Sequence, residues 1–126
     1  MYSFQDLTDI IAKLRSDQGC PWDRAQTYES LKQCLADEAQ EVYDAVDNHD
    51  MDNLCEELGD VLLQVMLNSQ IAREEGAFTI DDVIDGLCRK MIRRHPHVFG
   101  DAEVNSVEEG LALWNAIKAQ EKAERP

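Results

Sequence analysis

The sequence is poor in residues that interrupt helices and has no long hydrophobic run. Only 6 glycines and 3 prolines occur among its 126 residues, of which 44% are hydrophobic and 30% are charged. This composition is typical of a folded, helix-rich protein and argues against a disordered one. No uncharged hydrophobic run reaches the ~18 residues needed to cross a bilayer. The opening stretch MYSFQDLTDI lacks the basic and hydrophobic segments of a signal peptide, so we expect neither a membrane span nor a secretion signal.

Basic residues are also scarce. The 12 lysines and arginines stand against 26 aspartates and glutamates, which gives a formal charge of -14 at pH 7. This charge argues against the nucleic-acid backbone as a general partner. It does not exclude phosphate ligands, provided that metal ions or a local cluster of basic side chains reverse the sign at the site.

The cysteines are far apart in the sequence, and no two of them form a CxxC pair. Two of them fall on hydrophobic positions of expected helices. This pattern argues against a disulfide framework or a zinc site, and it favours reduced thiols in the core of a cytoplasmic protein. The residues concerned are Cys20, Cys34, Cys55 and Cys88.

Hydrophobic residues recur at helical spacing in five segments, and no segment of useful length alternates as a strand would. Serine or threonine residues suited to cap a helix precede four of these segments. We therefore expect an all-α fold with a single domain over residues 1–126, built as a bundle of about four to five helices. The expected helices begin at Ser3, Thr27, about Leu54, Thr79 and Ser106, and the first four end near Asp17, Asn48, Glu75 and Pro96.

The third expected helix is hydrophobic on nearly all sides between Val61 and Leu67. A helix of this kind is enclosed by neighbouring helices or by a second subunit. The other helices carry a single hydrophobic stripe that we expect to face the core. After the first helix, glycine and proline place Trp22 on a loop. The expected stripe of the fourth helix comprises Ile80, Val83, Ile84, Leu87 and Met91.

Carboxylates interrupt the hydrophobic pattern of the second and third helices. At about 100° per residue, Glu38 projects onto the inner face of its helix and Glu41 lies at the edge of that face. Glu57 and Asp60 are three residues apart and share one side of the next helix. Two antiparallel helices joined by a short turn would bring all four carboxylates together.

Four carboxylates in one place repel one another and take up protons unless divalent cations neutralise them. Hard oxygen ligands of this kind suit Mg²⁺ or Mn²⁺. The alternative is that these residues form the solvated faces of helices in a very acidic protein. Other carboxylate metal sites do not fit, because none of the three histidines follows a glutamate at the Glu-x-x-His spacing. The polar turn after the second helix also lacks the glycine of an EF-hand loop.

A basic run near the end of the fourth helix concentrates much of the positive charge. Lys90 and Arg94 lie one turn apart on the same face, where they could clamp a phosphate-bearing ligand. The alternative is that these cations stabilise the helix dipole with no ligand present.

Several ordered stretches of the sequence carry a resemblance that covers residues 4–122. They are Gly19 to Asp23 (GCPWD), Gln26-Thr27, Asp37 to Glu41 (DEAQE), Glu57 to Asp60 (ELGD) and Lys90 to Asp101 (KMIRRHPHVFGD). Together they resemble the MazG family of nucleoside triphosphate pyrophosphohydrolases, which belongs to the all-α NTP pyrophosphatase superfamily.

The resemblance implies an activity and a set of site residues. The activity is the Mg²⁺-dependent hydrolysis of nucleoside triphosphates. Water attacks the α-phosphorus, pyrophosphate is the leaving group, and the other product is a nucleoside monophosphate. The implied metal ligands are Glu38, Glu41, Glu57 and Asp60. This chain has Asp37 where the family usually has the first glutamate of EExxE, and Asp37, Glu38 or Glu41 is expected to orient the attacking water.

Further residues are candidates for nucleotide contacts. The resemblance implies that Lys90, Arg93 and Arg94 contact phosphates. Trp22 is a candidate to stack on the base, and its alternative role is packing within its own segment. We expect a homodimer or higher homo-oligomer, with no nucleic-acid or membrane partner. The sequence does not indicate which base or sugar of the nucleotide is preferred. Two alternative functions stay open: a pyrophosphatase for one particular nucleotide, and a non-catalytic nucleotide-binding or regulatory helical protein.

Overall fold

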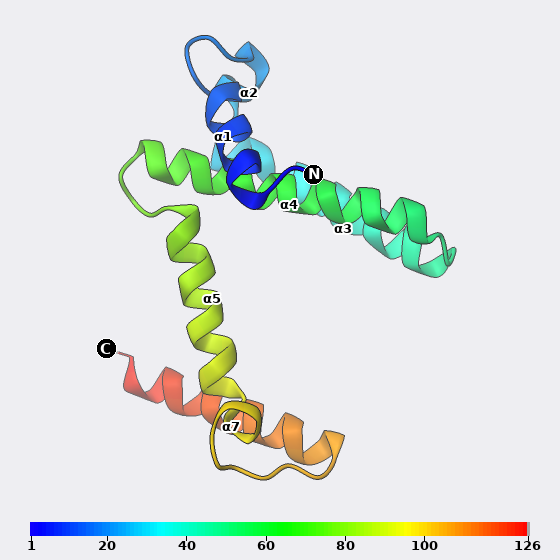
Figure 1. Ribbon diagram of the computed structural model, residues 1–126, viewed down its shortest axis with the longest axis vertical. Coiled ribbons are helices and arrows are strands. Elements are labelled where there is room, and N and C mark those ends of the chain that lie inside the picture. The colour runs from blue at the N-terminus through cyan, green and yellow to red at the C-terminus, as the bar shows by residue number, and fades with distance from the viewer. Residues whose placement is uncertain (126) are drawn as a thin grey trace. The chain divides into compact units, whose positions relative to one another are not determined.

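The computed structural model describes residues 1–125, and within that range it contains helices and no strands. The expected all-α fold is therefore confirmed. The five long helices correspond to the five expected ones. Of the two short helices, one lies in the stretch around Trp22 that was expected to be a loop, and the other follows the expected end of the fourth helix near Pro96. In chain order the helices are α1 (Phe4–Leu14), α2 (Pro21–Ala25), α3 (Tyr28–Asp47), α4 (Met51–Glu74), α5 (Ile80–Arg94), α6 (Pro96–Phe99) and α7 (Val107–Glu124) (Figure 1).

Several helices begin where the capping residues predict. The Ser3 hydroxyl accepts a hydrogen bond from the amide of Asp6, whose carboxylate accepts one from the Ser3 amide, and Thr27 begins α3 with the same reciprocal arrangement. Ser106 accepts from the amide three residues into α7. The start expected near Leu54 is wrong by one turn, because the Asp50 side chain caps α4 and the helix begins directly after it.

The chain divides into two compact units, Met1–Ile80 and the part that begins at Asp81. In the first unit, α3 and α4 lie side by side and antiparallel, and α1 packs against α4 (Figure 1). The connection between α3 and α4 is short, and within it His49 adopts a left-handed conformation, with φ of 53°. This allows the Asp50 amide to donate back to the carbonyl of Ala45 at 3.1 Å, which closes the end of α3. The tight connection fixes how the two helices pair.

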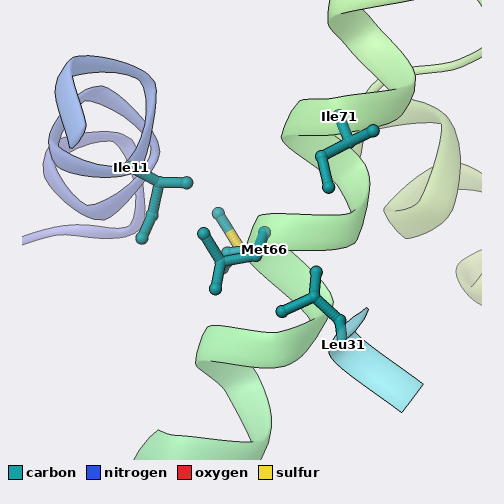
Figure 2. Packing of buried hydrophobic residues seen from close by; sticks show 5 residues of the cluster. Ile11, Leu31, Met66 and Ile71 are labelled. Carbon is teal, nitrogen blue, oxygen red and sulfur yellow. The ribbon is translucent and has the colours of Figure 1, made fainter. Parts of the chain in front are cut away.

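The hydrophobic core of the first unit lies where α1, α3 and α4 meet. Figure 2 shows Ile11 of α1, Leu31 of α3, and Met66 and Ile71 of α4 converging on one another. Leu67 completes the buried cluster. Leu7, Leu14, Leu63 and Ile80 pack around its edge. This core holds the halves of α3 and α4 that lie nearest to α1.

Several residues of the expected hydrophobic stripes are exposed in the chain. The neighbouring helices of the chain do not enclose Val61 to Leu67 on all sides, since Leu62 and Val65 are each 38% exposed. Enclosure by a second subunit stays a prediction. The predicted buried face of α5 is only partly covered, because Ile80, Val83 and Met91 are half-buried whereas Ile84 and Leu87 are exposed. The reason is that each hydrophobic stripe is wider than the part of the helix surface that the neighbouring helices of the same chain cover. Other exposed stripe residues are Phe4, Ile10, Leu35, Val46, Ile84, Leu87, Val107 and Leu111.

The cysteines are unpaired, as expected, but they are not core residues. Cys20 and Cys34 are half-buried, whereas Cys55 and Cys88 are exposed. The two exposed thiols lie on faces of α4 and α5 that no part of the described chain covers. Within residues 1–125, no helix combines the length and the hydrophobicity that a bilayer crossing requires.

Candidate metal centre

The antiparallel pairing of α3 and α4 brings four carboxylates together. Glu38 and Glu41 lie on α3, and Glu57 and Asp60 lie on α4. One oxygen from each of the four side chains lies within 4.8 Å of the others. The three-residue spacing on each helix places both of its carboxylates on the side that faces the neighbouring helix. The structure therefore forms the group of four carboxylates that the sequence predicts.

The four side chains differ in burial. Glu57 is only 8% exposed, Glu38 and Asp60 are half-buried, and Glu41 is exposed. The Oε2 atoms of Glu38 and Glu57 are buried and have no hydrogen-bond partner. None of the salt bridges found in residues 1–125 involves any of the four side chains. Within the described residues, the group of four carboxylates thus holds negative charge with which no basic side chain forms an ion pair.

The proton affinities of the buried members reflect this crowding. The pKa of Glu57 is raised to about 7, first by its hydrogen bond with Glu41 and then by burial and by the neighbouring carboxylates. Burial is the main cause that raises the pKa of Glu38, and Glu41 and Asp60 add to it through their charges. In the absence of a cation, the buried side of the group therefore tends to retain a proton at neutral pH.

The donor set fits a divalent metal ion. All the ligands are carboxylate oxygens, which suit a hard cation such as Mg²⁺ or Mn²⁺. The unpartnered oxygens of Glu38 and Glu57 are buried polar atoms that a cation would satisfy. The exposed Glu41 leaves one side of the group open to solvent, where water and a phosphate ligand can approach.

Asp37 lies outside the group of four carboxylates. It is exposed on α3, and its Oδ1 accepts a hydrogen bond from the Gln33 side chain at 2.7 Å. The group of four carboxylates therefore includes Glu38 and Glu41 of the DEAQE stretch but not Asp37.

The second unit contains the basic candidates. Arg93 and Arg94 of α5 both donate to the carboxylate of Glu121 on α7, at 2.5 and 2.9 Å. Arg94 is 8% exposed, and its guanidinium lies 4.7 Å from the ring centroid of Trp114. The hydrogen bonds from Arg93 and Arg94 lower the pKa of Glu121 to about 2. Lys90 is half-buried on the same helix.

Glu121 is a residue that sequence reasoning missed. It lies in the charged stretch near the C-terminus, and nothing in the spacing of that stretch distinguishes it from the neighbouring charges. Trp22 was expected on a loop, but it lies on α2, a single helical turn, where its side chain is 58% exposed.

A family model described as the MazG nucleotide pyrophosphohydrolase domain matches residues 26–99. This segment contains the group of four carboxylates and the basic run at the end of α5. Among curated proteins, the nucleoside triphosphate pyrophosphohydrolase/pyrophosphatase MazG of Thermotoga maritima is 55% identical over 122 residues, which cover 97% of this chain and 46% of that protein. The nucleoside triphosphate pyrophosphohydrolase of Escherichia coli is 40% identical over 126 residues, covering 99% of this chain and 48% of that protein.

The chain spans about half the length of these curated relatives. A solved structure gives fuller coverage. The crystal structure of a mazG-related protein from Thermotoga maritima matches with a TM-score of 0.71 at 32% sequence identity, covering 90% of this chain and 96% of that chain. Similarity thus extends to nearly the whole of one folded relative.

Proposed function

Because the chain belongs to the MazG nucleotide pyrophosphohydrolase family, we propose that it is a nucleoside triphosphate pyrophosphohydrolase. It hydrolyses the bond between the α- and β-phosphates of ribo- or deoxyribonucleoside triphosphates and releases a nucleoside monophosphate and pyrophosphate. The observation that carries the proposal is the group of four carboxylates with its two buried, unpartnered oxygens. Such a group suits a divalent ion on which the triphosphate is held, and we propose Mg²⁺, with Mn²⁺ as a substitute.

The carboxylates are proposed to bind the metal ion and to orient the attacking water. Glu38, Glu41, Glu57 and Asp60 hold the ion, which when bound neutralises phosphate charge and lowers the pKa of an attacking water. Glu57 must give up the proton that its raised pKa favours before it can act as a ligand. Asp37, Glu38 and Glu41 are the candidates to orient the water and accept its proton, and of these Asp37 and Glu41 are exposed.

The basic residues and Trp22 are proposed to bind the nucleotide. Lys90, Arg93 and Arg94 contact the phosphates, and Trp22 stacks on the base with its exposed indole ring. A triphosphate that reaches Arg93 and Arg94 competes with the carboxylate of Glu121, which both arginines contact in this structure.

We also propose that the chain is a single domain, that it assembles into a homodimer or higher homo-oligomer, and that it works in the cytoplasm. The exposed hydrophobic residues of α3 and α4 support self-association, and the four unpaired cysteines support a reducing compartment.

The test is product release from a panel of nucleoside triphosphates with and without Mg²⁺. We expect equal amounts of pyrophosphate and monophosphate, and only with the metal. Glu38→Gln and Asp60→Asn, each shown to be folded, should lose at least ~10-fold in kcat/KM, since disturbing even the support of a metal ligand costs this much. Glu56→Gln is the matched control, because Glu56 is exposed beside Glu57 and lies outside the group.

Full turnover by Glu38→Gln and Asp60→Asn would refute the assignment of the site. Nucleotide binding with no product release from any substrate would instead support the non-catalytic alternative.

A further inference from the structure

The short helix α2 has few contacts of its own to stabilise it. It has five residues, and its N-cap, Cys20, makes no side-chain capping hydrogen bond. A single turn of this length is unstable by itself, because nucleating a helix costs more than one turn of hydrogen bonds returns. The position of Trp22 on α2 therefore depends on contacts from other parts of the chain.

Arg15 supplies the main contact. Its side chain is only 8% exposed, and its Nη1 donates to the carbonyl oxygens of Asp23 and Gln26 at 2.5 and 3.2 Å. These carbonyls lie at the C-terminal end of α2, where a helix leaves acceptors unpaired and favours a positive charge. Arg15 thus adds a second donor to the Asp23 carbonyl, which also accepts from the Gln26 amide at 3.3 Å, and it supplies a donor to the Gln26 carbonyl at the C-cap.

The rest of the Arg15 guanidinium is fixed to α4. Its Nε and Nη2 donate to the two carboxylate oxygens of Glu74 at 2.9 and 3.0 Å. This paired geometry orients the guanidinium plane as well as its charge. Glu74 is the last residue of α4, the same continuous helix that carries Glu57 and Asp60. One side chain therefore links the α2 turn to the helix that carries half of the group of four carboxylates.

Two further contacts hold α2 in place. Arg24 donates to the carbonyl of Asp17 at 2.6 Å, and the Gln26 side chain donates to the carbonyl of Trp22 at 3.0 Å. The backbone of α2 is thus anchored, while the indole of Trp22 is 58% exposed. An exposed aromatic ring on an anchored backbone can bind a flat ligand without paying the entropy of ordering the segment that carries it.

We propose that Arg15 and Glu74 are positioning residues for nucleobase recognition: they hold α2 so that Trp22 presents its ring to the base. The inference rests on the proposed function for the class of ligand. Arg15 and Glu74 themselves contact neither the substrate nor the metal. They act through Trp22, so they should affect substrates that carry a base and spare those that do not.

The first test compares nucleoside triphosphates with methyl triphosphate, which has no base. Arg15→Lys keeps the charge but loses the planar fork, and Glu74→Gln weakens the pair while leaving the bonds from Arg15 to α2. Since stacking on an aromatic side chain contributes ~1–3 kcal/mol per base, we expect KM for nucleoside triphosphates to rise on the order of 10-fold. The kinetics with methyl triphosphate should be unchanged. Arg73→Lys, an exposed neighbour of Glu74, is the control.

The second test is a double-mutant cycle with Trp22→Ala. If Arg15 acts through Trp22, then Arg15→Lys should not raise KM further once the indole is gone. Additive effects on KM would overturn the inference. So would equal losses for methyl triphosphate and for nucleoside triphosphates in a folded variant, because that result would indicate a general structural role.

A third measurement does not require turnover. In protein labelled with 5-fluorotryptophan, Trp22→Ala identifies the ¹⁹F resonance of Trp22 against that of Trp114. A non-hydrolysable α,β-imido nucleoside triphosphate with Mg²⁺ should shift the Trp22 resonance in the wild type and have a smaller effect in Arg15→Lys. A Trp22 resonance that ignores the nucleotide would overturn the inference even if hydrolysis is normal. A wild type that shows the shift but releases no product would refute the proposed hydrolysis and leave the positioning role supported.

Discussion

Glu57 is a carboxylate whose pKa depends strongly on its surroundings, and it links stability, pH and metal binding. Its pKa is raised from the ordinary 4.5 to about 7, so the folded protein retains a proton that the unfolded chain has already lost. The contribution of Glu57 to stability is therefore present below pH 4.5 and is lost as the pH rises to about 7.

For metal-free protein in a chelating buffer, we expect the Tm of the wild type to fall between pH 5 and pH 8, relative to the Tm of Glu57→Gln. Saturating Mg²⁺ should remove this fall, because the ion binds the deprotonated carboxylate and stabilises the folded state. Thermal unfolding followed by circular dichroism measures both curves. Parallel curves for the wild type and Glu57→Gln would contradict the prediction.

Glu121 shows the opposite behaviour. Its two arginine partners lower its pKa from 4.5 to about 2, so its contribution to stability is present above pH 4.5 and is lost as the pH falls through about 2. We expect Glu121→Gln to lower the Tm at pH 7, and the difference from the wild type to vanish near pH 2. Glu124→Gln, an exposed carboxylate one turn further along α7, should change the Tm little at either pH. A destabilisation by Glu121→Gln that persists at pH 2 would exclude the ion pairs as its cause.

At the residue scale, what the sequence could predict depended on how far apart the partners lie in the chain. The one-turn spacing within each helix, combined with the antiparallel pairing expected from the short turn, predicted that Glu38, Glu41, Glu57 and Asp60 converge. The two arginine partners of Glu121 lie 28 and 27 residues away from it, and Glu74, the carboxylate partner of Arg15, lies 59 residues away. No periodicity within one element encodes such pairs.

At the scale of the elements, the connection between α3 and α4 sets the geometry of the site, since it determines which residues face each other. His49 is the only residue other than glycine with positive φ in residues 1–125. A left-handed conformation costs an ordinary residue ~1–2 kcal/mol, and glycine avoids this cost but loses ~0.5–1 kcal/mol to chain entropy. We expect His49→Gly to stabilise the protein by roughly 0.5–1 kcal/mol, measured by urea unfolding. Asn48→Gly, at a φ of -87°, should destabilise it.

The long helices were predictable from their hydrophobic stripes and capping residues, whereas the short ones were not. The five residues of α2 and the four of α6 are too few to show a helical period, and proline near the start of each indicated a turn. The contacts of Arg15, which come from outside α2, explain why that segment is helical. The start of α4 was missed because Asp50 suits a polar turn as well as a helix cap.

At the scale of the whole molecule, the hydrophobic residues that the chain leaves uncovered bear on its proposed self-association. Monomeric proteins rarely leave large hydrophobic patches in contact with water. Such residues recur along α3 and α4, the two helices that carry the group of four carboxylates. They are Leu35, Tyr43, Val46, Leu58, Leu62 and Val65. The sequence indicated this surplus through the nearly all-round hydrophobicity of α4, but it could not show which side of the helix the chain itself would cover.

If these residues form the interface between copies, a charge placed among them should separate the copies. We expect sedimentation equilibrium to give at least twice the mass of the chain for the wild type, and a mass close to that of one chain for Leu62→Lys. The substitution buries an uncompensated charge in the interface, but it leaves the core around Leu67 intact because Leu62 is 38% exposed in the single chain. Leu111→Lys, at a 60% exposed position on α7, tests whether any new lysine has this effect. A wild type that sediments as a single chain, or a Leu62→Lys variant that stays associated, would rule out this face as the interface.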